Sequence, residues 1–388
     1  MKTGADRFIV EKLKELSGKR IGLIVNHTSV LSNGIHLVDT LFNYGEIQIQ
    51  KLFSPEHGIR GNADAGKPIN DEIDPATGLK IVSLYGNNKK PTKEMLADID
   101  IIIYDIQDVG SRYYTYISTL YYAIEAAAEN NKKIIILDRP NPIGGEKVEG
   151  PVLELKFKSF IGITELPIRH GMTIGELGLL FNDDIKSKKS ISAELEVVAL
   201  SNWNRSEYYD VYSSGWLSPS PNINKLETAI VYPGTCLIEG TNLSEGRGTD
   251  EPFLMIGSPY IKSEDLITEL KNLTVEGIQL EPVTFTPVSI QGMSNSPKLK
   301  DTACNGIKIT ITDRNLFNPV EFGVKLLTTI IMLYPDSIKF NNEFFDKLAG
   351  TDKIRKMLLE KVEPGLIIRS WQEDLQKFLD KRNKYLLY

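Results

Sequence analysis

The fold is decided by the stretch from Asp100 to Asp138, which contains DIIIYD (Asp100–Asp105), a helical segment from about Tyr116 to Asn130, and KIIILD (Lys133–Asp138). Both apolar runs have the length expected of strands that are buried on two faces. A strand, a helix and a second strand in this order predict a parallel sheet of the doubly wound type.

The same pattern extends in both directions from this stretch. RIGLIV (Arg20–Val25), IQIQKLF (Ile47–Phe53) and KIVSLY (Lys80–Tyr85) predict further parallel strands. Toward the C-terminus, GIKITIT (Gly306–Thr312) predicts a strand and Pro319 the start of a long helix. We place a domain boundary near residue 228.

Length, composition and charge limit the class of protein. A chain of 388 residues is long for one core, and 41 % hydrophobic with 25 % charged residues is typical of a soluble globular protein. The net charge of -6 argues against nucleic acid as a partner. No apolar run reaches the roughly 18 residues of a membrane span. The start predicts a folded helix, so we expect a cytoplasmic protein, or an extracytoplasmic one if an export signal was removed.

The segment FSPEHGIRG (Phe53–Gly61) is the strongest candidate for chemistry. Glu56 and His57, adjacent groups that can exchange protons near neutral pH, stand between a proline and a glycine. An ordinary turn favours Gly, Asn, Asp and Ser and has no need of such a pair. The alternative is that Glu56 is a surface carboxylate or the partner of Arg60.

Polar clusters follow four of the predicted strands. In a parallel sheet their carboxyl ends lie along one edge, where open α/β sheets bind ligands. We therefore expect the active site at this edge. The clusters are Asn26–Ser29, Ser54–Gly58, Asp105–Arg112 and Asp138–Pro142.

Three later segments are ambiguous. Thr173 and Glu176 have capping-box spacing, and His170 just before them is either a ligand or a structural residue. The aromatic run from Trp203 to Trp216 suits stacking on a sugar ring or ordinary packing. The run Tyr232–Phe253 carries Glu245, Arg247 and Asp250, which are candidate chemistry or solvated turn residues.

Familiar cofactor sites are not visible. Residues 61–68 read GNADAGKP, which lacks the length and the hydroxyl of a phosphate-binding loop, and neither G-x-G-x-x-G nor H-E-x-x-H occurs. The two cysteines have no metal or redox spacing. His27, His57, Asp105 and Asp138 could in principle assemble a metal site but show no ligand spacing. We expect no cofactor and no metal.

Several long motifs resemble one family, the exo-acting peptidoglycan β-N-acetylmuramidases, or NamZ-type glycoside hydrolases, long catalogued as a domain of unknown function. The motifs are SPEHGIRG, YDIQDVGSRYYTYI, LDRPNPIGG, VEGP, RHGMTIGEL and EGTNLSEGRGTDEPF, and the match runs from about residue 20 to the C-terminus. The resemblance implies a Rossmann-like catalytic domain (residues 1–228), a smaller α+β domain (residues 229–388) that closes over a cleft, and release of N-acetylmuramic acid from the non-reducing ends of peptidoglycan-derived glycans or muropeptides. The family's proposed catalytic glutamate falls on Glu56.

Glycoside hydrolysis needs a protonated acid at the leaving oxygen, and a partly desolvated carboxyl such as Glu56 suits that role. His57 is its acid–base or orienting partner. The second group could be Asp105, Asp108, Glu245 or the 2-acetamido group of the substrate, and the stereochemistry stays open. An arginine should read the lactyl carboxylate of muramic acid. The candidate substrate-binding residues are Asn26, Arg60, Gln107, Arg112, Tyr113, Arg139, Asn141, His170 and Arg247.

Two other functions compete with this hypothesis: a cell-wall sugar-binding protein without turnover, and a metal-dependent hydrolase using the same crevice. Binding alone needs hydrogen bonds and stacking rather than a Glu-His pair, which argues against the first. The sequence leaves the oligomeric state open.

Overall fold

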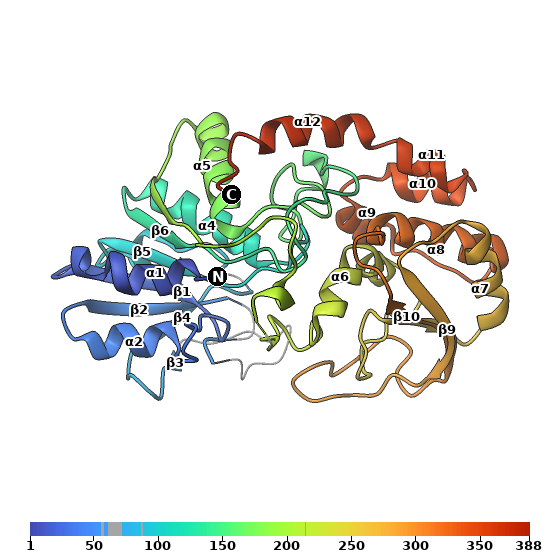
Figure 1. Cartoon of the computed structure of the whole chain (residues 1–388), viewed down its shortest axis with the longest axis horizontal. Helices are drawn as coiled ribbons and strands as arrows, with labels where there is room; N and C mark the ends of the chain where they lie inside the picture. Colours follow the sequence, from blue (N-terminus) through green and yellow to red (C-terminus); the bar gives the residue numbers. More distant parts are fainter. Residues whose placement is uncertain (56–57, 61–71, 87, 214) are drawn as a thin grey trace.

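The computed structural model describes residues 1–55, 58–60, 72–86, 88–213 and 215–388. Two lobes lie side by side along the longest axis, the N-terminal part of the chain in one and most of the C-terminal part in the other (Figure 1). Glu56 and His57 lie outside the described residues.

The first lobe is built around a seven-stranded sheet in the described part of the chain, with the order β3-β4-β2-β1-β5-β6-β7. The pairs are parallel except that of β3 with β4. The chain runs from β1 outward to β2 and then passes back to β5, so the topological switch point lies between β1 and β5. The predicted doubly wound, mostly parallel sheet is confirmed. The strands are β1 (Arg20–Val25), β2 (Gln48–Ser54), β3 (Glu72–Ile73), β4 (Lys80–Ser83), β5 (Ile101–Asp105), β6 (Lys133–Leu137) and β7 (Glu194–Val198).

Helices cover both faces of this sheet because its central strands are apolar on both sides. Ile101 and Ile103 of β5 pack in the cluster that holds helices α1 (Gly4–Glu11) and α2 (Leu37–Tyr44). Ile102 and Tyr104 face the other way, into the cluster with the remaining large helices of the lobe. Those helices are α4 (Tyr116–Glu129) and α5 (Ile174–Lys189), and the short α3 (Lys93–Leu96) precedes β5.

The second lobe is the smaller α+β unit that the sequence predicts. Its described residues form an antiparallel three-stranded sheet in the order β8-β10-β9, with β8 (Met255–Ser258), β9 (Ile278–Phe285) and β10 (Cys304–Ile311). Its helices are α7 (Ser263–Asn272), α8 (Pro319–Leu333), α9 (Asn342–Ala349), α10 (Lys353–Leu359) and α11 (Pro364–Arg369).

Helix α6 (Leu226–Thr235) joins the lobes and packs against α8. Glycines allow the close approach, since a Cβ on Gly234 would lie 1.8 Å from the carbonyl oxygen of Pro319. The proposed domain boundary near residue 228 lies within α6.

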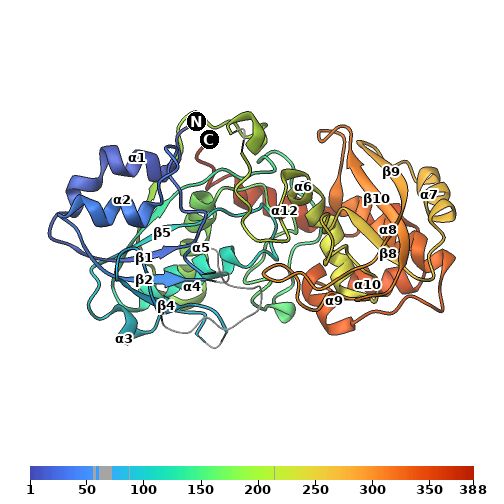
Figure 2. The ribbon, with the colours of Figure 1, turned by 90° about the horizontal axis from the view of Figure 1, so that it is seen from below.

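Helix α12 (Gln372–Arg382) returns from the second lobe to the first, and the chain ends lie near each other there (Figure 2). Lys2 pairs with Ser201, and the Leu200 N–H donates to the Tyr388 hydroxyl at 2.6 Å. No helix in the described ranges is long and apolar enough to cross a membrane.

Candidate active site

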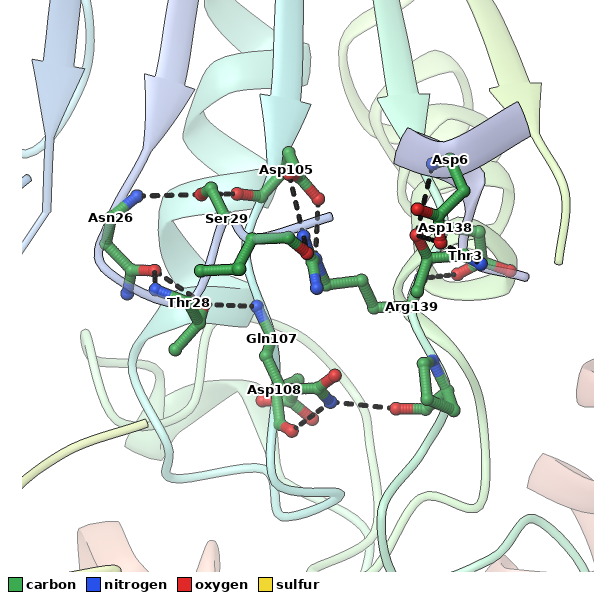
Figure 3. A network of polar contacts seen from close by, with 12 residues as sticks. Thr3, Asp6, Asn26, Thr28, Ser29, Asp105, Gln107, Asp108, Asp138 and Arg139 are labelled. Atoms are coloured by element: carbon green, nitrogen blue, oxygen red, sulfur yellow. Dashed lines mark hydrogen bonds and ion pairs between the residues drawn. The ribbon is translucent and has the colours of Figure 1, made fainter. Parts of the chain in front are cut away.

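The carboxyl ends of β1, β5 and β6 hold a continuous polar network (Figure 3). The Ser29 hydroxyl donates to the backbone carbonyl of Asp105, and the Gln107 N–H donates to the Thr28 hydroxyl oxygen at 3.0 Å. The structure thus brings together three of the four predicted polar clusters. The fourth follows β2, where Ser54 and Pro55 are buried, and its Glu56 and His57 are not described.

Asp105 and Arg139 form a buried bidentate pair at the centre of this network, with the arginine reaching across from the end of β6 (Figure 3). Arg139 Nε and Nη2 donate to the two carboxylate oxygens at 2.6 and 2.8 Å, and Nη2 also donates to the Val30 carbonyl at 3.2 Å. Removing one partner of such a pair leaves an uncompensated buried charge, at a cost of about 3–5 kcal/mol. The pair therefore holds the ends of β5 and β6 together.

Asp108, in the loop after β5, is less fully engaged. The Met172 N–H donates to His170 Nδ1 at 3.2 Å, so His170 Nε2 carries the proton and donates to Asp108 Oδ2 at 3.3 Å. The Gly110 N–H donates to the same oxygen at 2.7 Å. The other oxygen, Oδ1, is buried with no hydrogen-bond partner in the described part of the chain. This carboxylate can still accept a hydrogen bond.

Two of the predicted substrate-binding arginines are engaged with the protein itself. Arg60 donates to the carboxylates of Asp39 and Asp74 at 2.7–3.0 Å. Arg112 is fully buried, and burial lowers its pKa to about 10. It donates to backbone carbonyls of both lobes, those of Pro151, Leu166 and Leu348. Arg112 therefore ties the lobes together.

The predicted polar residues without charge are also buried. The Asn141 side chain donates to the Met172 carbonyl at 3.1 Å, and the Tyr113 hydroxyl shares its one hydrogen between the carbonyls of Pro233 and Tyr232, of which that of Pro233 is nearer. Asn26 accepts from Thr28, while its Nδ2 has no partner among the described atoms. Asn26 thus holds a buried donor, unpaired in the described part of the chain, at the end of β1.

A cavity of about 150 Å³ lies between the lobes, and we call it the interlobe cavity. Tyr113 and Tyr114 line it from the start of α4 in the first lobe. The second lobe and the segment that leads to it add aromatic and polar groups, which include Asn222, Tyr232, Glu239, Arg247, Phe253 and Phe344.

Arg247 is the cation of the interlobe cavity. Its Nε and Nη2 donate to one oxygen of Glu239 at 3.1 and 2.7 Å, and its guanidinium lies over the Phe253 ring at 5.0 Å. Nη1 has no hydrogen-bond partner in the described ranges. Because 29 % of the side chain is exposed, this nitrogen can reach a ligand.

Glu239 was missed by the sequence reasoning, which selected Glu245 from the same run. Glu245 does not line the cavity; it is buried, 2.9 Å from Lys298 Nζ and 3.5 Å from Arg247 Nε. The sequence feature that could have indicated this pair is the eight-residue separation of Glu239 and Arg247 within one Gly-rich segment.

No group of three or more His, Cys, Asp or Glu side chains that could hold a metal ion occurs in the described residues. His27 is one of the residues considered for such a site. Its Nε2 lies 2.8 Å from the Ser218 carbonyl oxygen, and burial lowers its pKa. This neutral imidazole anchors the segment that separates the polar network from the interlobe cavity.

A doubly wound domain joined to a smaller domain, with an aromatic, arginine-bearing cavity at the junction, is typical of two-domain enzymes that bind their ligand between the domains. Residues 21–227 match the family model described as "Exo-beta-N-acetylmuramidase NamZ, N-terminal", and residues 230–388 match its C-terminal counterpart. The chain belongs to the NamZ exo-β-N-acetylmuramidase family, which confirms the resemblance seen in the motifs.

Relatives and solved structures agree with this assignment. The chain is 44 % identical over 389 residues to the peptidoglycan beta-N-acetylmuramidase NamZ of Bacillus subtilis (strain 168), covering 100 % of this chain and 91 % of the relative. A DUF1343 family protein of Bacteroides fragilis NCTC 9343 superposes with a TM-score of 0.91 at 35 % identity, over 100 % of this chain and 98 % of that one. A second protein of that family and organism gives 0.80 at 33 % identity with the same coverage.

Proposed function

We propose that this chain is a glycosidase that releases N-acetylmuramic acid from the non-reducing ends of peptidoglycan fragments. The family membership and the 44 % identical muramidase support the reaction class. The observation that carries the proposal is Arg247 in the interlobe cavity, an arginine with an open nitrogen among aromatic rings.

Recognition of muramic acid depends on its lactyl carboxylate, which N-acetylglucosamine lacks. Arg60 is paired with two carboxylates, Arg112 is fully buried, and Arg139 forms a bidentate pair with Asp105; none of the three lines the interlobe cavity. Arg247 faces the interlobe cavity with Nη1 open. Arg247 therefore binds the lactyl carboxylate, and the aromatic rings pack against the sugar.

Exo-cleavage fits the position of the cavity. A cavity between two lobes suits a chain end better than a continuous glycan strand. The lobes are fixed to each other through Arg112 and through the chain end that returns after α12. The proposed substrate therefore enters by its non-reducing end.

For catalysis we assign the general acid to Glu56, with His57 as its orienting partner. Glu56 is the second residue after β2 and stands in the family's SPEHG motif. Strand β1 lies between β2 and β5, so the acid and Asp108 follow strands on either side of β1. We assign the second role to Asp108, because Asp105 and Glu245 are paired with arginine and lysine side chains, while Asp108 Oδ1 is buried without a hydrogen-bond partner among the described atoms.

The test is incubation of the pure protein with a disaccharide that carries N-acetylmuramic acid at its non-reducing end, with and without chelator. Free N-acetylmuramic acid in both arms, and no internal cleavage of intact glycan, supports the proposal. Mixed oligomers from intact glycan would contradict exo-action. Binding without turnover would favour the alternative of a sugar-binding protein. Activity that is lost when chelator is added would favour the alternative of a metal-dependent hydrolase.

A further inference from the structure

A second cavity, of about 300 Å³, lies at the carboxyl ends of β1, β5 and β6, and we call it the switch-point cavity. It shares no lining residue with the interlobe cavity. Its position beside the β1–β5 switch point is the place where doubly wound sheets bind ligands. Its principal lining residues are Thr28, Gln107, Arg139, Tyr209, Tyr212 and Trp216.

The aromatic run noted in the sequence forms one wall of this cavity. Tyr209 and Trp216 pack edge to face, with ring centroids 5.4 Å apart. The Trp216 Nε1–H donates to the Ile223 carbonyl at 2.8 Å, and the Tyr212 hydroxyl accepts from the Asn204 N–H. The rings are therefore held in place before any ligand binds, which lowers the entropic cost of binding.

The strand ends also contribute polar groups to the cavity. Gln107 spends both hydrogens of its amide on the carbonyls of Asp108 and Pro140, each at 2.8 Å, which leaves Oε1 as an acceptor. Arg139 has engaged Nε and Nη2 and keeps Nη1 as a donor. An acceptor and a donor beside aromatic rings match the hydroxyl and amide groups of a sugar.

The charges around this cavity disfavour an anionic sugar. Arg139 is neutralised by Asp105. Asp6 also lines the cavity; burial opposes its ionisation, but hydrogen bonds from Ser32 and Thr3 lower its pKa below the usual value. With the amino group of Met1, which also lines the cavity, these charges sum to about zero, so the cavity offers no net positive charge to a sugar carboxylate and suits a neutral sugar.

We propose that the switch-point cavity is a second carbohydrate site, which binds a neutral N-acetylhexosamine. The choice of sugar rests on the proposed function, because N-acetylglucosamine is the neutral partner of muramic acid in the glycan. The sugar is either a free monosaccharide or a unit of a glycan.

A single segment separates the two cavities. Trp216 and Leu217 line the switch-point cavity, while Ser220 and Asn222 line the interlobe cavity. Two hydrogen bonds hold the residues between them. Nε2 of the neutral His27 donates to the Ser218 carbonyl at 2.8 Å, and the Tyr116 hydroxyl donates to the Pro219 carbonyl at 3.0 Å.

The experiment is a calorimetric titration of the full chain with N-acetylglucosamine and, separately, with its β-1,4-linked dimer. Tyr209→Ala should weaken binding about tenfold, and Tyr209→Phe, which keeps the ring, should change it less than threefold. Tyr44→Ala, in a partly buried tyrosine remote from both cavities, is the matched control and should bind as the parent does. Tighter binding of the dimer assigns the site to a glycan, and equal binding assigns it to the free sugar.

Leu217→Arg provides a second variant if Tyr209→Ala does not fold, because Leu217 is 41 % exposed and lies at the edge of the cavity. It should also weaken binding about tenfold. Unchanged binding in folded variants at Tyr209 and Leu217, or loss of all binding in Arg247→Ala alone, would overturn the second site. These readouts need no turnover, so they separate failure of this inference from failure of the proposed hydrolase activity.

Discussion

Replacement of Arg247 by alanine tests how the protein selects muramic acid. The side chain makes two hydrogen bonds to one oxygen of Glu239 and keeps Nη1 open toward the interlobe cavity. If this nitrogen binds the lactyl carboxylate, its loss should lower kcat/KM for muramic acid substrates and leave N-acetylglucosamine substrates nearly unchanged. The measured quantity is therefore the ratio of the two kcat/KM values.

The expected magnitude has two parts. A hydrogen bond between charged groups contributes roughly 1.5–3 kcal/mol, which is about a 10- to 100-fold change in the ratio. The alanine variant also leaves Glu239 without its cation, and a carboxylate within about 4 Å of another is repelled by up to ~4 kcal/mol at an effective dielectric constant of about 20. The double variant Arg247→Ala with Glu239→Gln removes this repulsion, so the ratio of the two kcat/KM values should show only the 10- to 100-fold change.

The assay compares nitrophenyl glycosides of N-acetylmuramic acid and N-acetylglucosamine. Arg314→Ala is a closely matched control: Arg314 has a side chain 31 % exposed, pairs with Asp210 at 2.7 Å and lies 4.4 Å from a tyrosine ring, yet lines neither cavity. Arg247→Lys keeps the charge without the planar fork and should retain part of the preference. An unchanged ratio in the double variant would refute the assignment of the lactyl group to Arg247.

Three further variants test the rest of the proposal. Glu56→Gln should lower kcat by roughly 10²–10⁴, and less for a nitrophenol leaving group than for a sugar; equal losses would place the acid elsewhere. Asp108→Asn should lower kcat by about 10² or more with little change in KM, whereas a change in KM alone would make it a binding residue. Asp138 is fully buried, and burial raises its pKa to about 7. Because the folded protein then holds a proton that the unfolded chain has lost, its unfolding free energy should fall by about 1.4 kcal/mol for each unit by which the pH rises between 4 and 7. Denaturant titrations should show a shallower slope against pH in Asp138→Asn, and identical slopes would contradict the raised pKa of Asp138.

The sheet was predictable where strands are buried on both faces. The run DIIIYD corresponds to β5, the predicted helix after it to α4, and Thr173 with Glu176 forms the expected capping box. Strand β7 was not predicted, because it lies at the sheet edge and its sequence ELEVV is short, carries two charges and is only partly buried. The two-residue β3 is too short to leave a periodic signal.

The site was predictable to the level of the sheet edge but not to the level of individual charges. Arg60 finds a partner 21 residues away, Arg139 one 34 residues away, and Arg112 a carbonyl 236 residues away. A sequence motif indicates that an arginine lies near a crevice. Which of its N–H groups remain unpaired depends on acceptors from elements that are distant in the sequence. Glu239 was missed for the same reason. Lys298, in a distant loop, forms an ion pair with Glu245, and Glu239 is the glutamate that lines the interlobe cavity. The choice among four similar arginines follows from which guanidinium nitrogens the folded chain leaves unpaired, and in the interlobe cavity that is Nη1 of Arg247.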